Sequence, residues 1–138
     1  MRNIQDYVPL YFNPKNPMFY TISENKDIII LEIKKDIIKK TNSIFSDGNA
    51  ASKDSKLYKD LSFFNNEISF CLYNPTWNDI EDGKRIRCSE ALIYPSIPTS
   101  FIQRIICSTE EKANLFRLIF KNLTSIPIEY HQHFFFNP

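Results

Sequence analysis

Glycine is scarce in this chain, with only Gly48 and Gly83 among 138 residues. Phosphate-binding loops of the P-loop and dinucleotide types need several closely spaced glycines, so the sequence excludes both kinds. A nucleotide, if one binds, must therefore be held by another geometry.

Cysteine and histidine are also few. Cys71, Cys88 and Cys107 are widely spaced, without a CxxC pair, which is typical of reduced, buried thiols rather than of disulfides or a zinc site. The two histidines, His131 and His133, would share one face of a strand, and two are too few for zinc. The sequence predicts no metal site.

A strong charge of either sign and a long apolar run are missing as well. Seventeen basic and sixteen acidic residues give a net charge of +1, so no global attraction to nucleic acid or membrane follows. No apolar stretch is long enough to span a bilayer, and no signal peptide is recognisable. We therefore expect a cytoplasmic protein without membrane contact.

Aromatic and aliphatic residues are abundant, with 12 Phe, 7 Tyr and a hydrophobic share of 43%. The length fits one domain, residues 1–138.

Residues 27–33 form a β-branched run that we expect to be buried on both faces. The helix that Thr109 should cap would place Leu115, Phe116, Leu118 and Ile119 inward. Strands are predicted at 6–12, 27–33, 44–46, 85–94, 101–107, 126–128 and 130–136, helices at 17–22, 34–40, 56–64 and 110–123, and a surface loop at 65–83. This order favours an α+β fold.

Glu90 is the most informative single residue. It follows a basic run, 84–87, at the point where the predicted strand becomes apolar. A carboxylate there is unfavourable unless it is paired or used. The plain interpretation is a salt bridge to Arg85, Arg87 or a nearby lysine, and the alternative is a functional carboxylate.

Two further stretches leave alternatives open. Residues 7–20 interleave aromatic side chains with Asn and Lys, a pattern that suits either base stacking or an aromatic core. The turn 47–51 contains Asn49, whose amide suits either reading a base edge or simply forming the turn.

Taken together, four stretches resemble one family. They are YVPLYFNPKNPMFY (7–20), IFSDGNAAS (44–52), KRIRCSEALIYPSIPTSFIQRI (84–105) and the closing aromatic segment. In this order they resemble the DarT family of ADP-ribosyltransferase toxins. The resemblance implies a split β-sheet core with flanking helices, NAD as the substrate, and transfer of ADP-ribose to a base, typically thymidine, in single-stranded DNA. It also implies an antitoxin partner of the macrodomain type.

The resemblance also implies roles for individual residues. Glu90 corresponds to the catalytic glutamate, which would stabilise an oxocarbenium-like ribose carbon. Asn49 and Met18 would lie near the base. The side chains of Lys84, Arg85 and Arg87 would bind DNA phosphates.

Departures from the family pattern are equally specific. Lys15 stands where an arginine is usual, and Cys88-Ser89 where glutamine-alanine is usual. The family's leading strand and helix, which supply an NAD-binding histidine and a catalytic arginine, have no counterpart here. We therefore expect a domain incomplete at its N-terminus, leave the NAD-binding residues unassigned, and expect weak or absent catalysis. The alternative function is a remnant that binds DNA or a partner without catalysis.

Overall fold

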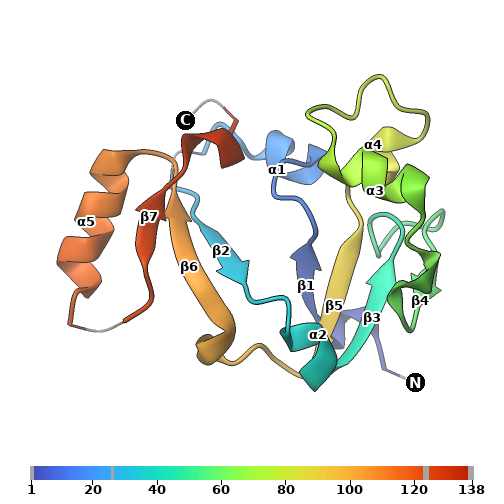
Figure 1. Ribbon diagram of the computed structural model, residues 1–138, viewed down its shortest axis with the longest axis horizontal. Coiled ribbons are helices and arrows are strands. Elements are labelled where there is room, and N and C mark those ends of the chain that lie inside the picture. Colours follow the sequence, from blue (N-terminus) through green and yellow to red (C-terminus); the bar gives the residue numbers. More distant parts are fainter. Residues whose placement is uncertain (1, 26, 123–124, 137–138) are drawn as a thin grey trace.

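The computed structural model describes residues 2–25, 27–122 and 125–136. Two separate β-sheets stand side by side (Figure 1), one with strand order β1-β5-β3-β4 and the other with order β2-β6-β7. The strands are β1 (Val8–Tyr11), β2 (Ile30–Ile33), β3 (Asn42–Ser46), β4 (Leu57–Tyr58), β5 (Glu90–Tyr94), β6 (Ile102–Cys107) and β7 (Ile128–Tyr130). The predicted α+β class and split sheet are confirmed.

Short helices surround the sheets. In Figure 1, α3 and α4 lie together beside the four-stranded sheet, and α2 lies where the chain passes from one sheet to the other. The α-helices are α1 (Pro17–Thr21), α2 (Ile37–Lys40), α3 (Asn66–Tyr73), α4 (Gly83–Ile86) and α5 (Glu110–Phe120), and the 3₁₀ helices are η1 (Ile4–Asp6), η2 (Leu61–Phe63), η3 (Thr99–Phe101) and η4 (Gln132–Phe134). Within the described ranges, every helix is too short or too polar to cross a membrane.

Strand β5 is the centre of the four-stranded sheet. It pairs antiparallel with both β1 and β3, and Ala91, Leu92 and Ile93 are buried. Pro9 lies on β1, which forms the edge of this sheet. A proline has no amide hydrogen to donate to a neighbouring strand, which suits an edge strand.

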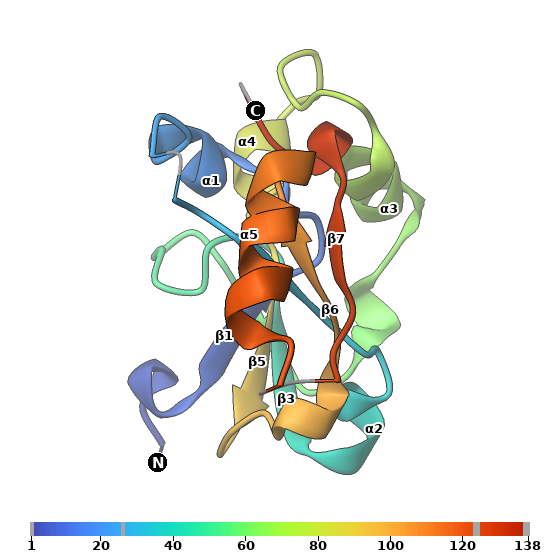
Figure 2. The same cartoon turned by 90° about the vertical axis from the view of Figure 1, so that its left-hand side faces the viewer.

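The three-stranded sheet packs against α5, which covers it on one flank of the molecule (Figure 2). Cys107, Ala113 and Ile128 form the buried centre of this contact, with Phe116 and Phe120 against it. The inward face predicted for α5 was therefore wrong in part, since Leu115, Leu118 and Ile119 are more than half exposed. The predicted start of α5 after Thr109 is confirmed, but the helix ends at Phe120, before its predicted end at 123, and residue 123 itself lies outside the described residues.

Strand β2 also differs from its prediction. Leu31 is 47% exposed, so the strand is not buried on both faces. β2 is the edge of its sheet and pairs only with β6. A continuous apolar run thus forms an edge strand here, one side of which faces the other sheet.

Four other segments were predicted wrongly, and in two of them a capping side chain decides the outcome. Residues 56–64 contain β4 and η2 instead of one helix, because the Asp60 carboxylate accepts a hydrogen bond from the Ser62 amide and begins a new turn. Residues 65–83 contain the helix α3, whose N-cap is Asn65. Arg85 and Ile86, predicted to begin the strand 85–94, are helical instead, in α4, whose N-cap Asp82 adopts φ 56°. After β7, residues 132–134 are also helical rather than extended.

Candidate active site

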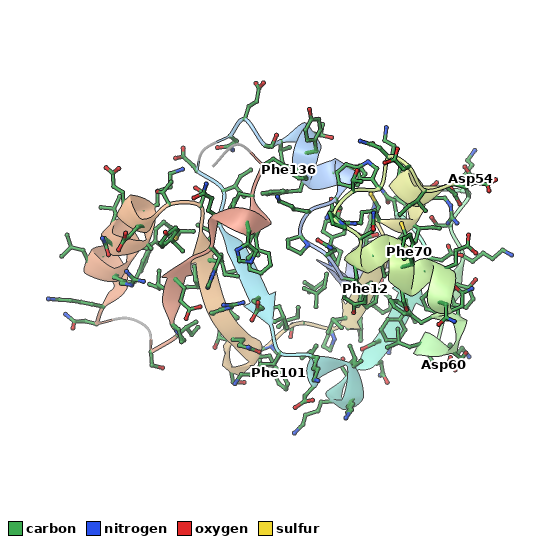
Figure 3. All side chains as sticks on the ribbon, turned by 45° about the horizontal axis from the view of Figure 1, so that its top comes forward. Phe12, Asp54, Asp60, Phe70, Phe101 and Phe136 are labelled. Atoms are coloured by element: carbon green, nitrogen blue, oxygen red, sulfur yellow. The ribbon has the colours of Figure 1, made fainter. Side chains whose placement is uncertain are left out.

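A groove of about 740 Å³ runs between the facing edge strands β1 and β2. Its lining is mainly apolar and comes from both sheets and from α1. In Figure 3, Phe12 lies in the middle of the view, Phe136 lies above it beside α1, and Phe101 lies below it beside α2. The lining residues from β1 and α1 include Pro9, Leu10, Tyr11, Phe12, Met18, Phe19 and Ile22, and those from the β2 side include Ile28, Ile30, Glu32 and Phe134. A volume of this size is typical of small-molecule sites.

Glu90 is the first residue of β5 and lies next to this groove. It pairs directly across the sheet with Tyr11, which lines the groove. The Glu90 side chain is almost completely buried, with 7% exposed, and its Oε2 accepts a hydrogen bond of 2.6 Å from the Ala50 amide. The Glu90 amide in turn donates to Oγ of Ser46 at 3.1 Å. Both ends of the residue are therefore fixed by the β3–β4 region.

The salt-bridge interpretation of Glu90 does not fit the structure. Arg85 pairs with Asp47 and Asp82, and no described lysine or arginine forms an ion pair with Glu90. Burial raises the pKa of the Glu90 carboxyl, and the Ala50 hydrogen bond opposes that shift. The carboxylate is thus held by a backbone amide in a desolvated position, as a group with a chemical task often is.

Tyr11 shares the environment of Glu90. Burial, followed by the nearby charges of Glu90 and Cys88, raises the pKa of the Tyr11 hydroxyl to about 12. At neutral pH this hydroxyl is protonated and can donate a hydrogen bond. Tyr11 was not predicted as a site residue, because the register between β1 and β5 cannot be read from either strand alone.

Asn49 and Met18 are brought together with Glu90. Asn49 directly precedes Ala50, and its Nδ2 lies 3.9 Å from Sδ of Met18, which lines the groove. Oδ1 of Asn49 also accepts a hydrogen bond of 2.9 Å from the Ala51 amide. Asn49 therefore does form the turn, and its amide nitrogen still contacts Met18. The roles of Asn49 and Met18 in binding a substrate stay predictions.

The three basic residues before Glu90 occupy very different positions. Lys84 is exposed on α4. Arg85 is partly exposed, with 26% of its side chain accessible, and is occupied by two aspartates. Arg87 is buried, with 2% exposed. The predicted role in binding DNA phosphates therefore fits Lys84 and does not fit Arg87.

The buried side chain of Arg87 connects the end of α4 with the turn before α1 and the C-terminal end of α3. Its Nε donates to the Lys15 carbonyl at 2.8 Å, and its Nη1 donates to the carbonyls of Cys71 at 2.9 Å and Asn74 at 2.6 Å. Its guanidinium lies 5.6 Å from the centre of the Trp77 ring. Arg87 is the C-cap of α4, and the turn between α4 and β5 directs its side chain into the protein.

Among the described residues, the groove lining contains no positively charged side chain that could bind the diphosphate of NAD. Among its lining residues Glu32 is the only charged one, and Lys15 lies between Pro14 and Asn16, which line it. Asn16 is fully buried and its side chain is occupied by Asn13, Pro14 and Phe19. In the described ranges, no three His, Cys, Asp or Glu side chains gather as a possible metal site.

Comparisons with known proteins agree with this arrangement. A curated relative from Thermosipho africanus (strain H17ap60334), the DNA ADP-ribosyl transferase–DNA ADP-ribosyl glycohydrolase fusion protein, is 28% identical over 142 residues. The match includes 99% of this chain but 36% of the relative, so the chain spans about a third of the fusion protein.

Solved structures have the same fold. Thermosipho africanus DarTG in complex with ADP-ribose superposes with a TM-score of 0.85 at 29% identity, over 99% of this chain and 38% of that one. Thermus sp. 2.9 DarT in complex with carba-NAD⁺ gives a TM-score of 0.84 at 17% identity, over 98% of this chain and 76% of that one. At that identity the Thermus comparison shows the fold alone.

The family model described as "ssDNA thymidine ADP-ribosyltransferase, DarT" matches residues 1–136. This match extends over both sheets and all the residues discussed above. The chain therefore belongs to the DarT family.

Proposed function

We propose that this protein transfers ADP-ribose from NAD to a base, thymidine, in single-stranded DNA, with Glu90 as the catalytic carboxylate. The observation that supports this most is the placement of Glu90, which is buried, held by the Ala50 amide and adjacent to a nucleotide-sized groove. Family membership supports the same reaction, as does a Thermus relative solved with ADP-ribosylated single-stranded DNA.

The chemistry requires little from the protein beyond positioning and one negative charge. The bond between the ribose C1′ and nicotinamide breaks, and its electron pair leaves with nicotinamide. Positive charge develops on the ribose carbon, where a fixed carboxylate in a desolvated site stabilises it. A nucleophilic atom of the base then forms the new bond to C1′ and gives up its proton.

The groove suits part of NAD well. Its apolar lining fits the flat nicotinamide ring, and the Tyr11 hydroxyl lies beside Glu90 to donate a hydrogen bond to the substrate. The diphosphate needs a cation, and the basic residue Lys15 lies between two lining residues, Pro14 and Asn16. We propose Lys15 for this contact, at the position where the sequence departs from the family's arginine.

DNA would approach from the side of the β3–β4 loop and α4. Asn49 and Met18 touch each other and lie beside the Ala50–Glu90 contact, so we propose that they bind the base. Exposed Lys84 would bind a phosphate. Since NAD and DNA occur together in the cytoplasm, we propose that the protein acts there. The fused relative also supports a partner that removes ADP-ribose, such as a macrodomain antitoxin.

The test is incubation of the protein with NAD and thymidine-containing single-stranded oligonucleotides, followed by mass spectrometry of the DNA. We expect a mass gain of one ADP-ribose, and a loss of roughly 10²- to 10³-fold in rate for Glu90→Gln. Glu129→Gln is the matched control, because Glu129 lies on the other sheet, in β7. Equal rates for Glu90→Gln and the wild type would exclude the proposed mechanism.

The second candidate function is binding of DNA without catalysis, and the same samples distinguish it from the enzyme. Fluorescence anisotropy with the same oligonucleotides measures DNA binding whether or not the DNA is modified. Binding without any mass gain would favour the remnant over the enzyme.

A further inference from the structure

Arg85 lies across the β3–β4 loop instead of pointing away from the protein. Its Nη1 donates to both the carbonyl oxygen and Oδ1 of Asp47, each at 3.0 Å. Its Nε donates to Oδ2 of Asp82 at 2.7 Å. One guanidinium thus links the start of the loop to the start of α4.

Asp47 closes this loop at its base. Its Oδ1 accepts from the Lys56 amide at 2.8 Å, and its Oδ2 accepts from the Tyr58 hydroxyl at 3.3 Å. The Asp47 amide also donates to the Lys56 carbonyl at 3.3 Å. The Asp47 side chain therefore joins Arg85 to both ends of the segment that carries Asn49 and Ala50.

Gly48 provides the space in which Arg85 crosses the loop. A Cβ at this position would lie 2.9 Å from Cγ of Arg85 and 2.5 Å from Oγ of Ser55. The Gly48 carbonyl accepts from Ser46 Oγ at 2.5 Å, and the same Ser46 oxygen accepts from the Glu90 amide. Two residues after Gly48, the Ala50 amide holds Oε2 of Glu90. A continuous set of contacts thus leads from Arg85 to the carboxylate.

We propose that Arg85 is a positioning residue, which through Asp47 fixes the loop so that the Ala50 amide orients the Glu90 carboxylate. The inference rests on the proposed function, because it assigns to Arg85 a part in the reaction of Glu90. It replaces the role in DNA binding that the sequence predicted for Arg85, since the guanidinium is already engaged by two aspartates.

The arginine fork is necessary for this arrangement. One planar guanidinium reaches Asp47 and Asp82 at once through two different nitrogens. A lysine ammonium is a single point charge and does not reproduce that geometry. Arg85→Lys therefore keeps the positive charge for any DNA contact but loses the link, which separates the two roles.

The kinetic test compares Arg85→Ala, Arg85→Lys and Asp47→Asn in the transferase assay. We expect kcat to fall roughly 10- to 100-fold in Arg85→Ala, because small displacements of a reacting group have effects of that size. The KM for DNA should change less than kcat, and its dependence on salt should stay that of the wild type, because Arg85 itself does not contact DNA in this proposal. Arg85→Lys should lie close to Arg85→Ala, and the double variant Arg85→Ala/Asp47→Asn should be no slower than the slower single variant.

Arg117→Ala is the matched control. The Arg117 guanidinium also donates to a backbone carbonyl, that of Ile128, but on the far side of the three-stranded sheet. We expect it to lower stability and leave kcat unchanged. A fall in kcat common to Arg117→Ala and Arg85→Ala would assign the effect to general destabilisation and overturn the proposal.

A second measurement does not need transferase activity. NMR of the Ala50 amide should show faster hydrogen exchange in Arg85→Ala, and the Glu90 carboxyl should titrate at higher pH once that amide moves away. If wild-type protein is inactive but this result is obtained, the proposed function fails while the link to Glu90 stands. Unchanged Ala50 exchange and Glu90 titration in folded Arg85→Ala would overturn the proposal.

The dependence of KM on salt distinguishes the proposal from the alternative, in which Arg85 binds a DNA phosphate. If Arg85 bound a DNA phosphate, Arg85→Ala would raise the KM for DNA, flatten its dependence on salt and leave kcat intact, and Arg85→Lys would resemble the wild type. That pattern would overturn the proposal. If Arg85→Ala does not fold, Asp47→Asn, which keeps the size of the side chain, provides the same readouts.

Discussion

Each half of the molecule contains one arginine that connects several segments, and the two arginines bind different kinds of partner. In the four-stranded half, Arg87 is buried and donates to three backbone carbonyls, one in the turn before α1 and two at the C-terminal end of α3. In the three-stranded half, Arg104 is partly exposed and pairs with carboxylates on the strands to either side, Glu32 and Glu129. The first kind of contact joins the turn before α1 to the C-terminal end of α3, whereas the second joins strands already paired by their backbones.

The largest effect on stability should come from Arg87→Ala. Three carbonyls would lose their donor in a buried site, where each unsatisfied group is unfavourable. We expect a loss of about 2–4 kcal/mol in the free energy of unfolding, measured by urea denaturation. Arg104→Ala is the comparison, and a loss as large as that of Arg87→Ala would contradict the distinction between the halves.

Sequence alone could not separate these two arginines, since each is flanked by isoleucine in a short apolar context. It did predict β1, the start of α1 and the start of α5, because Pro9, Pro17 and Thr109 act on their own neighbours. It did not predict α3, since asparagines near residue 65 look like a loop until one of them caps a helix.

The site was predictable to a similar extent. Glu90, Asn49 and Met18 came from a family resemblance, and the structure brings them together. The contacts that orient Glu90 were not predictable, because the Ala50 amide and Tyr11 depend on strand register. The same holds for Arg85 and Arg87, which differ only through the turn after α4.

Helix caps offer a second comparison between the halves. Asn16 caps α1 at the groove, is fully buried, accepts from the Phe19 amide and donates to the carbonyls of Asn13 and Pro14. Thr109 caps α5 through one bond of 3.2 Å from the Lys112 amide. Asn16→Ala should therefore lower stability by about 2 kcal/mol and Thr109→Ala by about 1 kcal/mol, by thermal or urea unfolding. Equal losses would show that burial of the cap is unimportant.

The carboxylates of the two halves should respond to pH in opposite directions. Burial raises the folded-state pKa of Glu90, so its contribution to stability is present below its ordinary value of 4.5 and is lost as the pH rises through the raised value. Hydrogen bonds from Arg104 and then His131 lower the pKa of Glu129, so its contribution is present above 4.5 and is lost as the pH falls through the lowered value.

Unfolding free energies measured against pH for Glu90→Gln and Glu129→Gln test these signs. Relative to the wild type, Glu90→Gln should gain stability as the pH rises above 4.5. Glu129→Gln should lose stability over the neutral range and approach the wild type on acidification. Transferase activity should fall as the pH drops through the Glu90 value, because the reaction needs the ionised carboxylate. Parallel curves for the two variants would contradict the assignment.

The smallest effect on stability is expected for Arg104→Ala. Its guanidinium meets Glu32 through two bonds, of 2.9 and 2.8 Å, and Glu129 through one of 2.9 Å, all on strands already paired. Such partly exposed pairs contribute about 0.5–1 kcal/mol, and less as salt rises. The loss should therefore shrink at high ionic strength, unlike that of Arg87→Ala.

Arg104→Ala nevertheless has a consequence for the groove. Glu32 lines the groove proposed to receive NAD, and without Arg104 its negative charge would be left uncompensated there. That charge would repel the diphosphate of NAD bound at Lys15. The KM for NAD should then rise while kcat changes little, and Glu32→Gln combined with Arg104→Ala should restore it. A KM that stays unchanged would mean that Glu32 lies too far from the diphosphate of NAD to affect its binding.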